Sequence, residues 1–262
     1  MIPKVIHYCW FSNDRKPRLI RKCIASWKRN MPDYEIKCWD GDALRQLINE
    51  GKTPAFVADA ISAHKWAFAS DWLRLYVLYN YGGIYLDSDI LVYKSFDCFL
   101  KHSFFSGTKK CDEGRSYEVE GAIIGAVPGL PIFLKIMDYY KDKHLLDASG
   151  DLAVPTMPVV LMEYFTELGY VPVPKNQFLS TAEGDFAFYA EHTFINNMDL
   201  KINGDKGYYA RHCNTVSWRM QTSLLMEYRN FLLLHFPSIF WALQRLRSFL
   251  RKDYRWKDKD LI

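Results

Sequence analysis

The residues best suited to chemistry lie in one short run, Tyr85-Leu86-Asp87-Ser88-Asp89. We predict a strand from Ile84 to Tyr93, whose period of two would place Tyr85, Asp87 and Asp89 on one face. Two carboxylates this close in an apolar strand repel each other, so ionising both away from water needs a compensating cation. Mn²⁺ or Mg²⁺ would supply that charge, since both prefer oxygen ligands and also accept phosphate oxygens. The alternative is a strand-end turn whose aspartates face solvent.

A second charged pair, Asp71 and Arg74, precedes this run. The segment from Trp66 to Tyr81 is apolar on nearly every side, which predicts a buried helix that ends at Gly82-Gly83. Residues three apart share a face of a helix, so Asp71 and Arg74 would lie side by side. The pair is either a structural ion pair or a grip on sugar hydroxyls or a phosphate, and the sequence leaves both open.

The elements that would position these residues begin at the N-terminus. A β-branched and aromatic run from Val5 to Phe11 predicts a first strand, helical spacing follows from Leu19 to Trp27, and alternation from Tyr34 to Cys38 predicts a second strand. This order indicates a parallel sheet in an α/β fold. Trp10 would end the first strand at the carboxyl edge, where such sheets bind ligands, and either stack on a nucleobase or pack in the core.

The remainder of the chain gives weaker signals. Glycine and proline punctuate the segment from Gly121 to Pro131, and a helix is expected from Ile132 to Tyr140. The 262 residues fit one large domain. We expect a domain over residues 1–230, with a nucleotide-sugar part at 1–95 and an acceptor-side part at 96–230, followed by a helical extension at 231–262.

Composition limits the classes of function. The six cysteines form no C-x-x-C pair, and no leader or membrane-spanning stretch is evident, so we expect a cytoplasmic protein with reduced thiols. The net charge of +4 equals the excess of basic over acidic residues between 244 and 262, which leaves the body formally neutral. A neutral body argues against nucleic-acid binding.

The last 32 residues, 231–262, combine large apolar side chains with basic ones. The basic residues are Arg245, Arg247, Arg251, Lys252, Arg255, Lys257 and Lys259. A basic amphipathic segment can lie on an anionic membrane surface, here the inner face of the cell membrane. The alternative is a helix whose apolar side packs on the domain.

Two of these runs carry a family resemblance. Ala69-Ser70-Asp71-Trp72-Leu73-Arg74, followed by Tyr81-Gly82-Gly83-Ile84-Tyr85-Leu86-Asp87-Ser88-Asp89, resembles the DXD-containing sugar-binding region of glycosyltransferase family 32. The opening from Ile2 to Phe11 also resembles that family's first strand, and the bacterial capsular-polysaccharide branch is the nearest. The resemblance implies a GT-A type fold with a Rossmann-like mixed sheet flanked by helices.

The resemblance also implies roles for single residues. Trp10, with Tyr8 before it, would bind the donor's base, Asp71 and Arg74 would contact the donor sugar, and Tyr85 would line the site. Asp87 and Asp89 would hold the metal and the diphosphate. The run from His212 to Trp218 is similar to a late H-x4-S-W element, which implies His212 as a further metal ligand and Ser217 and Trp218 at the diphosphate. Ser12 and Glu120 replace a glycine and an asparagine of the family, which leaves the sugar open.

The function implied is retaining transfer of a sugar from a nucleoside diphosphate sugar to an oligosaccharide or lipid-linked glycan, in synthesis of a bacterial surface polysaccharide. We favour a UDP-sugar over a GDP-sugar as donor. One alternative is a haloacid-dehalogenase-like phosphatase with Asp87 as nucleophile, although Leu91 stands where that class places threonine or valine. Another is a protein that binds nucleotide-sugar without catalysis.

Overall fold

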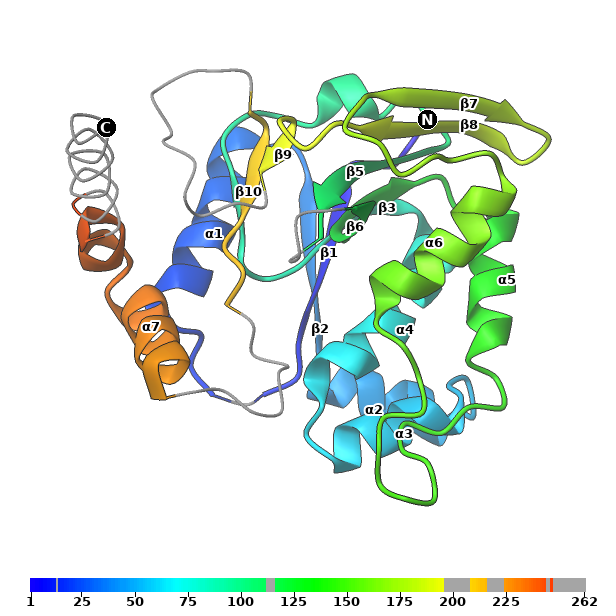
Figure 1. The fold of residues 1–262 in the computed structure, drawn as a ribbon, viewed down its shortest axis with the longest axis horizontal. Helices are drawn as coiled ribbons and strands as arrows, with labels where there is room; N and C mark the ends of the chain where they lie inside the picture. The colour runs from blue at the N-terminus through cyan, green and yellow to red at the C-terminus, as the bar shows by residue number, and fades with distance from the viewer. Residues whose placement is uncertain (13, 112–115, 196–207, 216–223, 244–245, 247–262) are drawn as a thin grey trace, which may run out of the picture.

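The computed structural model describes residues 1–12, 14–111, 116–195, 208–215, 224–243 and 246. Its centre is a seven-stranded mixed sheet in the order β2-β1-β3-β6-β5-β8-β7 (Figure 1). The strands are β1 (Val5–Trp10), β2 (Glu35–Asp40), β3 (Gly83–Leu86), β5 (Phe104–Lys110), β6 (Tyr117–Ala126), β7 (Gln177–Thr181) and β8 (Gly184–Tyr189). β1 is parallel to both β2 and β3, whereas β6 is antiparallel to β3 and β5.

Helices cover both faces of this sheet (Figure 1). One face carries α2 (Gly41–Asn49), α3 (Ala55–Ser62), α4 (Trp66–Tyr81), α5 (Pro131–Tyr139) and α6 (Met157–Glu167), and the larger apolar core lies beneath them. The other face carries α1 (Arg18–Asn30) and a small second sheet of β4 (Ile90–Val92), β10 (Ala210–His212) and β9 (Phe194–Ile195), over a second core. Burial on both faces explains why β3 is apolar at every position.

The expected opening of the chain is confirmed. Strand, helix and strand form β1, α1 and β2, and the buried helix from Trp66 to Tyr81 has the predicted bounds. The buried polar residues of α4, which are Ser70, Asp71 and Arg74, lie among apolar residues on all its sides. The expected fold class, a GT-A type α/β fold with a Rossmann-like mixed sheet flanked by helices, is confirmed as well.

One expectation about a strand is wrong. The single strand expected from Ile84 to Tyr93 is broken, because β3 ends at Leu86 and the chain turns before β4 begins at Ile90. Residues 121–126 of the segment punctuated by glycine and proline belong to β6, a strand inside the sheet. Its glycines serve close packing: a Cβ on Gly125 would come within 2.0 Å of the Phe105 ring.

The glycine pair between α4 and β3 is needed for backbone and space. Gly82 and Gly83 have φ of 64° and 96°, in the region that favours glycine. A Cβ on Gly83 would lie 2.6 Å from the carbonyl oxygen of Val5, and one on Gly82 would lie 2.6 Å from Pro128. The pair therefore lets α4 end directly against β1 and fixes where β3 starts.

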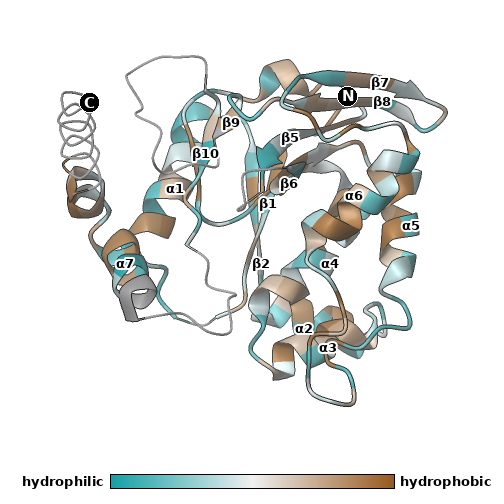
Figure 2. Ribbon diagram, in the orientation of Figure 1, coloured by the Kyte–Doolittle hydropathy of each residue, from teal (hydrophilic) through white to brown (hydrophobic). Residues whose placement is uncertain are grey.

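The C-terminal part of the described chain packs beside α1. Helix α7 (Leu224–His235) is followed by a helical segment at 237–243, and Leu233 and Phe240 form a small core with Leu19 and Cys23 of α1. Figure 2 shows hydrophobic residues on both α7 and the segment after it. The seven basic residues of the expected membrane segment lie outside the described residues, and the division of the chain at residues 95 and 230 stays a prediction. Within the described part of the chain, every helix is too short or too polar to cross a membrane.

A buried histidine ties the glycine pair to β1 and β2. His7 is 1% exposed, its Nε2 lies 2.9 Å from the Gly82 carbonyl oxygen, and its Nδ1 accepts a hydrogen bond of 3.1 Å from Trp39 Nε1. Because Nδ1 accepts, the ring is neutral and Nε2 carries the proton that Gly82 accepts. Burial lowers the pKa of His7 to about 4, although the Gly82 carbonyl favours the charged form.

This histidine makes the fold sensitive to acid. The folded-state pKa lies below the ordinary value of 6.5, so below that pH the unfolded chain binds a proton that the folded chain excludes. Stability is therefore complete above the ordinary pKa and falls toward pH 4. We expect wild type to lose about 2 to 3 kcal/mol more unfolding free energy than His7→Gln on going from about pH 7 to pH 4.5. Urea unfolding at each pH measures this, and equal losses in the two proteins would contradict it.

Candidate metal and donor site

Asp87 and Asp89 lie in the turn that joins β3 to β4. The Asp87 amide donates to the Ala122 carbonyl on β6 at 2.9 Å, and the Ile90 amide donates to the Asp87 carbonyl at 3.0 Å. The last sheet contact of β3 and a tight turn therefore follow each other directly. The two carboxylates come together through this turn, rather than through the alternation of one strand.

Asp89 is the more firmly held of the two aspartates. Its Oδ2 accepts hydrogen bonds of 3.0 Å from both the amide and the hydroxyl of Thr215, and His212 Nε2 lies 3.3 Å from its Oδ1. Burial by itself would raise the pKa of Asp89, but His212 and Thr215 outweigh it and the pKa lies below its usual value. Asp89 therefore stays ionised although it is only 6% exposed.

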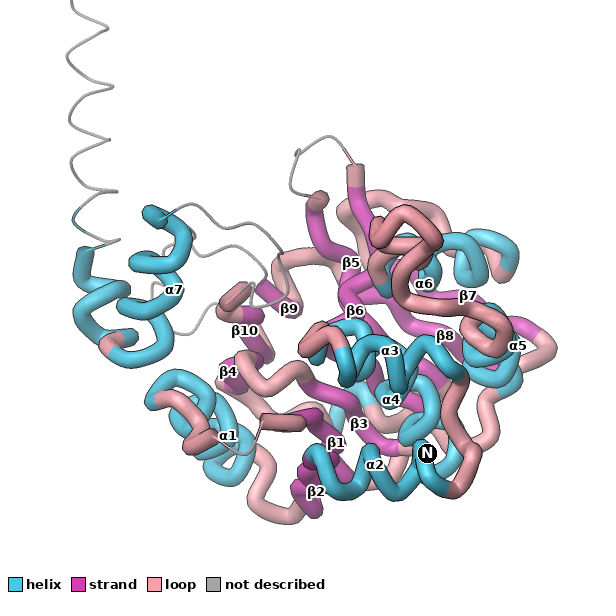
Figure 3. Tube along the Cα trace, turned by 90° about the horizontal axis from the view of Figure 1, so that it is seen from below, coloured by secondary structure: helices cyan, strands magenta, loops and turns pink. Residues whose placement is uncertain are grey.

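The strand after this turn, β4, is held on both edges. On one edge α1 supplies side chains: Trp27 Nε1 donates to the Ile90 carbonyl at 2.7 Å, and Ser26 Oγ accepts from the Val92 amide at 2.9 Å. On the other edge β10 pairs antiparallel, with His212 opposite Ile90. Figure 3 shows β4 between α1 and β10. This register brings His212, far along the chain, beside Asp89.

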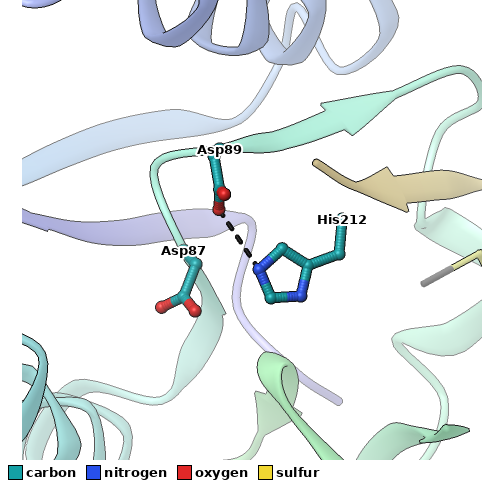
Figure 4. A group of neighbouring side chains, drawn as sticks. All are labelled: Asp87, Asp89 and His212. Carbon is teal, nitrogen blue, oxygen red and sulfur yellow. Dashed lines mark ion pairs between the residues drawn. The ribbon is translucent and has the colours of Figure 1, made fainter. Parts of the chain in front are cut away.

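Three side chains from this region converge on one point. Asp87, Asp89 and His212 each offer a ligand atom, and these atoms lie within 4.8 Å of one another. In Figure 4 the aspartates extend from the turn after β3 and His212 reaches toward Asp89 from β10. Two carboxylate oxygens and an imidazole nitrogen at this spacing fit a divalent cation such as Mn²⁺. These three side chains therefore fit the expected divalent metal, and they include His212.

Arg74 connects the group of Asp87, Asp89 and His212 to Asp71. Its Nη2 donates to Asp71 Oδ1 at 2.7 Å and lies 3.6 Å from Asp87 Oδ1, and its guanidinium lies 4.7 Å from the Tyr85 ring centroid. Nη1 donates to the Gly121 carbonyl on β6. The expected ion pair is thus present, and the same arginine also reaches an aspartate of the metal group.

The carboxyl group of Asp71 is in an unusual environment. Burial raises its pKa to about 7, and the charge of Asp87 adds to this, while Arg74 opposes both. Tyr85 is also buried, and its hydroxyl donates to Asp87 Oδ1 at 3.0 Å. This hydrogen bond from Tyr85 orients the Asp87 carboxylate.

The two residues expected at the donor's base differ in exposure, and Lys16 Nζ lies near both rings, 5.8 Å from the Tyr8 centroid. Trp10 is half-buried at the end of β1, and Lys16 Nζ lies 5.4 Å from its ring centroid. Tyr8 is 6% exposed and packs edge-on against Trp27 in the core, so its ring is less accessible than that of Trp10. Ser217 and Trp218 lie outside the described residues. The roles of all these residues stay predictions.

Glu120 and Lys109 belong to the same charged group, although the sequence did not indicate either as a site residue. Glu120 is 2% exposed on β6, with Oε1 at 3.6 Å from His212 Nδ1. Burial would raise its pKa, but Lys109, His212 and the Ala122 amide lower it to about 2. The available signal for Glu120 was its place at a position where the resembled family carries asparagine. Lys109 pairs with Glu118 at 3.2 Å, and its charge acts on both Glu120 and Asp87.

The sequence of this chain is similar to those of several known proteins. An uncharacterized glycosyltransferase of Acanthamoeba polyphaga mimivirus is 28% identical over 134 residues, which are 51% of this chain and 53% of the relative. The mannosyl phosphorylinositol ceramide synthase SUR1 of Saccharomyces cerevisiae is 27% identical over 202 residues, covering 74% of this chain and 49% of that protein. This chain thus spans about half the length of these curated relatives.

Among solved structures, the PaToxG glycosyltransferase superposes with a TM-score of 0.43 and 23% identity, over 64% of this chain and 71% of that one. The resemblance seen in the sequence is supported at the level of a glycosyltransferase family by the sequence relatives. Residues 1–144, which include α4, β3 and the Asp87–Asp89 turn, match the family model described as capsular polysaccharide synthesis protein. Because this match covers more than half of the chain, the protein belongs to the capsular polysaccharide synthesis protein family.

Proposed function

We propose that the protein is a metal-dependent, retaining glycosyltransferase that moves a sugar from a nucleoside diphosphate sugar to a glycan acceptor. The observation that carries this proposal is the convergence of Asp87, Asp89 and His212 within 4.8 Å, with Arg74 in contact with Asp87. The group follows the carboxyl end of β3, which is parallel to β1, at the sheet edge where α/β folds bind ligands.

The residues divide the work by position. Asp87, Asp89 and His212 would hold Mn²⁺ or Mg²⁺, and the imidazole favours Mn²⁺ because Mg²⁺ prefers oxygen ligands alone. Such an ion, when bound, stabilises the negative charge that develops on a departing diphosphate. Arg74 keeps Asp87 oriented through its 3.6 Å ion pair, and Tyr85 donates to the same carboxylate.

The donor is proposed to extend from this group toward Trp10 on one side and Asp71 on the other. The half-buried ring of Trp10 offers a face for a base, and Tyr8 supports it from the core. Asp71 and Arg74 would contact the sugar, and Ser217 and Trp218 the diphosphate, as the family resemblance implies. A UDP-sugar is favoured over a GDP-sugar, and no described residue is assigned as nucleophile or base.

The acceptor is proposed to be an oligosaccharide or lipid-linked glycan of a bacterial surface polysaccharide. The family's description as capsular polysaccharide synthesis protein supports this context. The yeast relative is named as a synthase of a mannosylated ceramide, which supports transfer to a lipid-linked acceptor. These relatives favour sugar transfer over the phosphatase alternative, in which Asp87 would be a nucleophile.

Contact with an anionic membrane surface is proposed for the C-terminal part of the chain. Part of its apolar side packs on α1, as the alternative expectation held. Other large apolar side chains there are exposed, namely Tyr228, Phe231, Phe236, Ile239, Leu243 and Leu246. Together with the basic residues that follow in the sequence, they suit a peripheral location on the inner face of the cell membrane.

The metal assignment is tested by Asp87→Asn. Removing one charged ligand should weaken Mn²⁺ binding and lower Mn²⁺-dependent release of nucleoside diphosphate by about 100-fold or more, since metal stabilisation of the transition state is worth several kcal/mol. The measurement is release from a panel of nucleotide-sugars with and without Mn²⁺. Asp42→Asn, which removes an exposed aspartate paired with Arg45, is the control and should retain wild-type rates.

Three outcomes would oppose the assignment. Full turnover by Asp87→Asn would remove the proposed metal site. A phosphoryl group trapped on Asp87 would establish the phosphatase alternative. Calorimetric binding of a nucleotide-sugar without any turnover would indicate a non-catalytic protein.

The membrane proposal is tested by paired substitutions. Ile239→Ser with Leu243→Ser removes two exposed apolar side chains one helical turn apart, and should weaken binding to phosphatidylserine vesicles by about tenfold or more. Val171→Ser with Phe178→Ser removes two equally exposed apolar side chains elsewhere and should have no effect. Vesicle sedimentation measures both, and equal binding by all three proteins would refute the membrane contact.

A further inference from the structure

We propose that Glu120 is a positioning residue, whose carboxylate accepts the Nδ1 proton of His212 and so turns the Nε2 lone pair toward Asp87 and Asp89. This inference rests on the proposed metal site and adds a residue to it. Glu120 lies on β6 of the main sheet and His212 on β10 of the small sheet. The contact between them therefore joins the two sheets at the site.

The imidazole of His212 lies between two carboxylates. Nε2 is 3.3 Å from Asp89 Oδ1, and Nδ1 is 3.6 Å from Glu120 Oε1. Nδ1 is buried and makes no hydrogen bond within the usual distance in the described structure, so Glu120 is the acidic partner that faces it. A buried ring nitrogen requires a hydrogen-bond partner, and a small rotation of the ring would bring Nδ1 within hydrogen-bond distance of this carboxylate.

Glu120 is held where it can perform this role. Its Oε1 accepts a hydrogen bond of 3.0 Å from the Ala122 amide, and its own carbonyl accepts one of 2.8 Å from Ser106 Oγ. The side chain is 3% exposed, so it has no alternative position in solvent. The Glu120 carboxylate therefore faces His212 from a strand of the main sheet, where its position is fixed by these hydrogen bonds.

The chemistry of imidazole explains why such a partner matters. A neutral histidine has one lone pair, and the hydrogen bond made by one ring nitrogen decides which nitrogen keeps it. A carboxylate at Nδ1 retains the proton there, fixes the ring plane and makes Nε2 a better ligand. Without Glu120 the proton could occupy Nε2, which would block the ligand position beside Asp89.

The test measures Mn²⁺ affinity in the absence of any sugar donor. Glu120→Gln keeps an oxygen that can accept from Ala122 but removes the charge, and should weaken Mn²⁺ binding by about 10- to 100-fold. In a His212→Ala background the same substitution should change the affinity by less than about twofold, because its effect passes through the ring. Isothermal titration of the full chain gives each dissociation constant, and the metal-free melting temperature checks folding.

Two further variants separate position from charge. Glu120→Asp keeps the charge but withdraws the carboxylate by one methylene, so it should also weaken Mn²⁺ binding. Glu118→Gln removes a charge two residues away on the same strand, where the side chain pairs with Lys109, and should leave the affinity unchanged.

The proposal is overturned if Glu120→Gln binds Mn²⁺ as wild type does, or if it loses the same factor with and without His212. The second result would make Glu120 a direct ligand or a general source of negative charge. If Glu120→Asp bound Mn²⁺ with wild-type affinity, the negative charge of residue 120 would matter and its position would not, which would also contradict the proposal. If wild type itself binds no Mn²⁺, both this inference and the metal-dependent function fail, whereas wild-type binding with an inert Glu120→Gln sinks this inference alone.

Discussion

Four carboxylates lie within one buried region of this protein, and their mutual repulsion is the constraint on which the site depends. Asp71, Asp89 and Glu120 are buried, and Asp87 is half-buried with its Oδ1 3.6 Å from Arg74. Ionised groups at this depth require compensating charge. Arg74 and Lys109 supply it, together with His212 when its ring is protonated, so the fold arranges cations from three different elements around a centre that still carries an excess of acidic groups. That excess is what a divalent cation and its phosphate ligands would use.

The surrounding elements fix the positions of the aspartates in this group. The glycine pair lets α4 meet β1, which sets the start of β3 and so the place where Asp87 leaves the sheet. α1 and β10 then hold both edges of β4, and this fixes the position of Asp89 directly before it. The glycine pair lies just before Asp87 in sequence, whereas α1 and β10 reach β4 from distant parts of the chain.

The site is assembled from two parts of the chain that are far apart in sequence. Asp71, Arg74, Asp87 and Asp89 come from a continuous stretch of α4, β3 and the turn after it, within the family match. His212 and Thr215 arrive from the C-terminal third and close the group against β4. Glu120 bridges the two parts, because it belongs to the main sheet but faces the histidine of the small one. The metal group therefore exists only when both sheets are formed.

The local elements and the charged residues follow from the sequence alone. The apolar run around Asp71 and Arg74 predicted α4 with its bounds, because burial on all sides leaves a compositional trace. Tertiary structure decided the rest. The strand after Ile84 breaks because β4 pairs with β10, a contact across more than a hundred residues that no local pattern encodes. Position 125 of β6 requires glycine because the Phe105 ring occupies the space beside it, and Glu120 faces His212 because two sheets meet there. Such placements depend on the free energy of long-range packing, which a run of neighbouring residues does not contain.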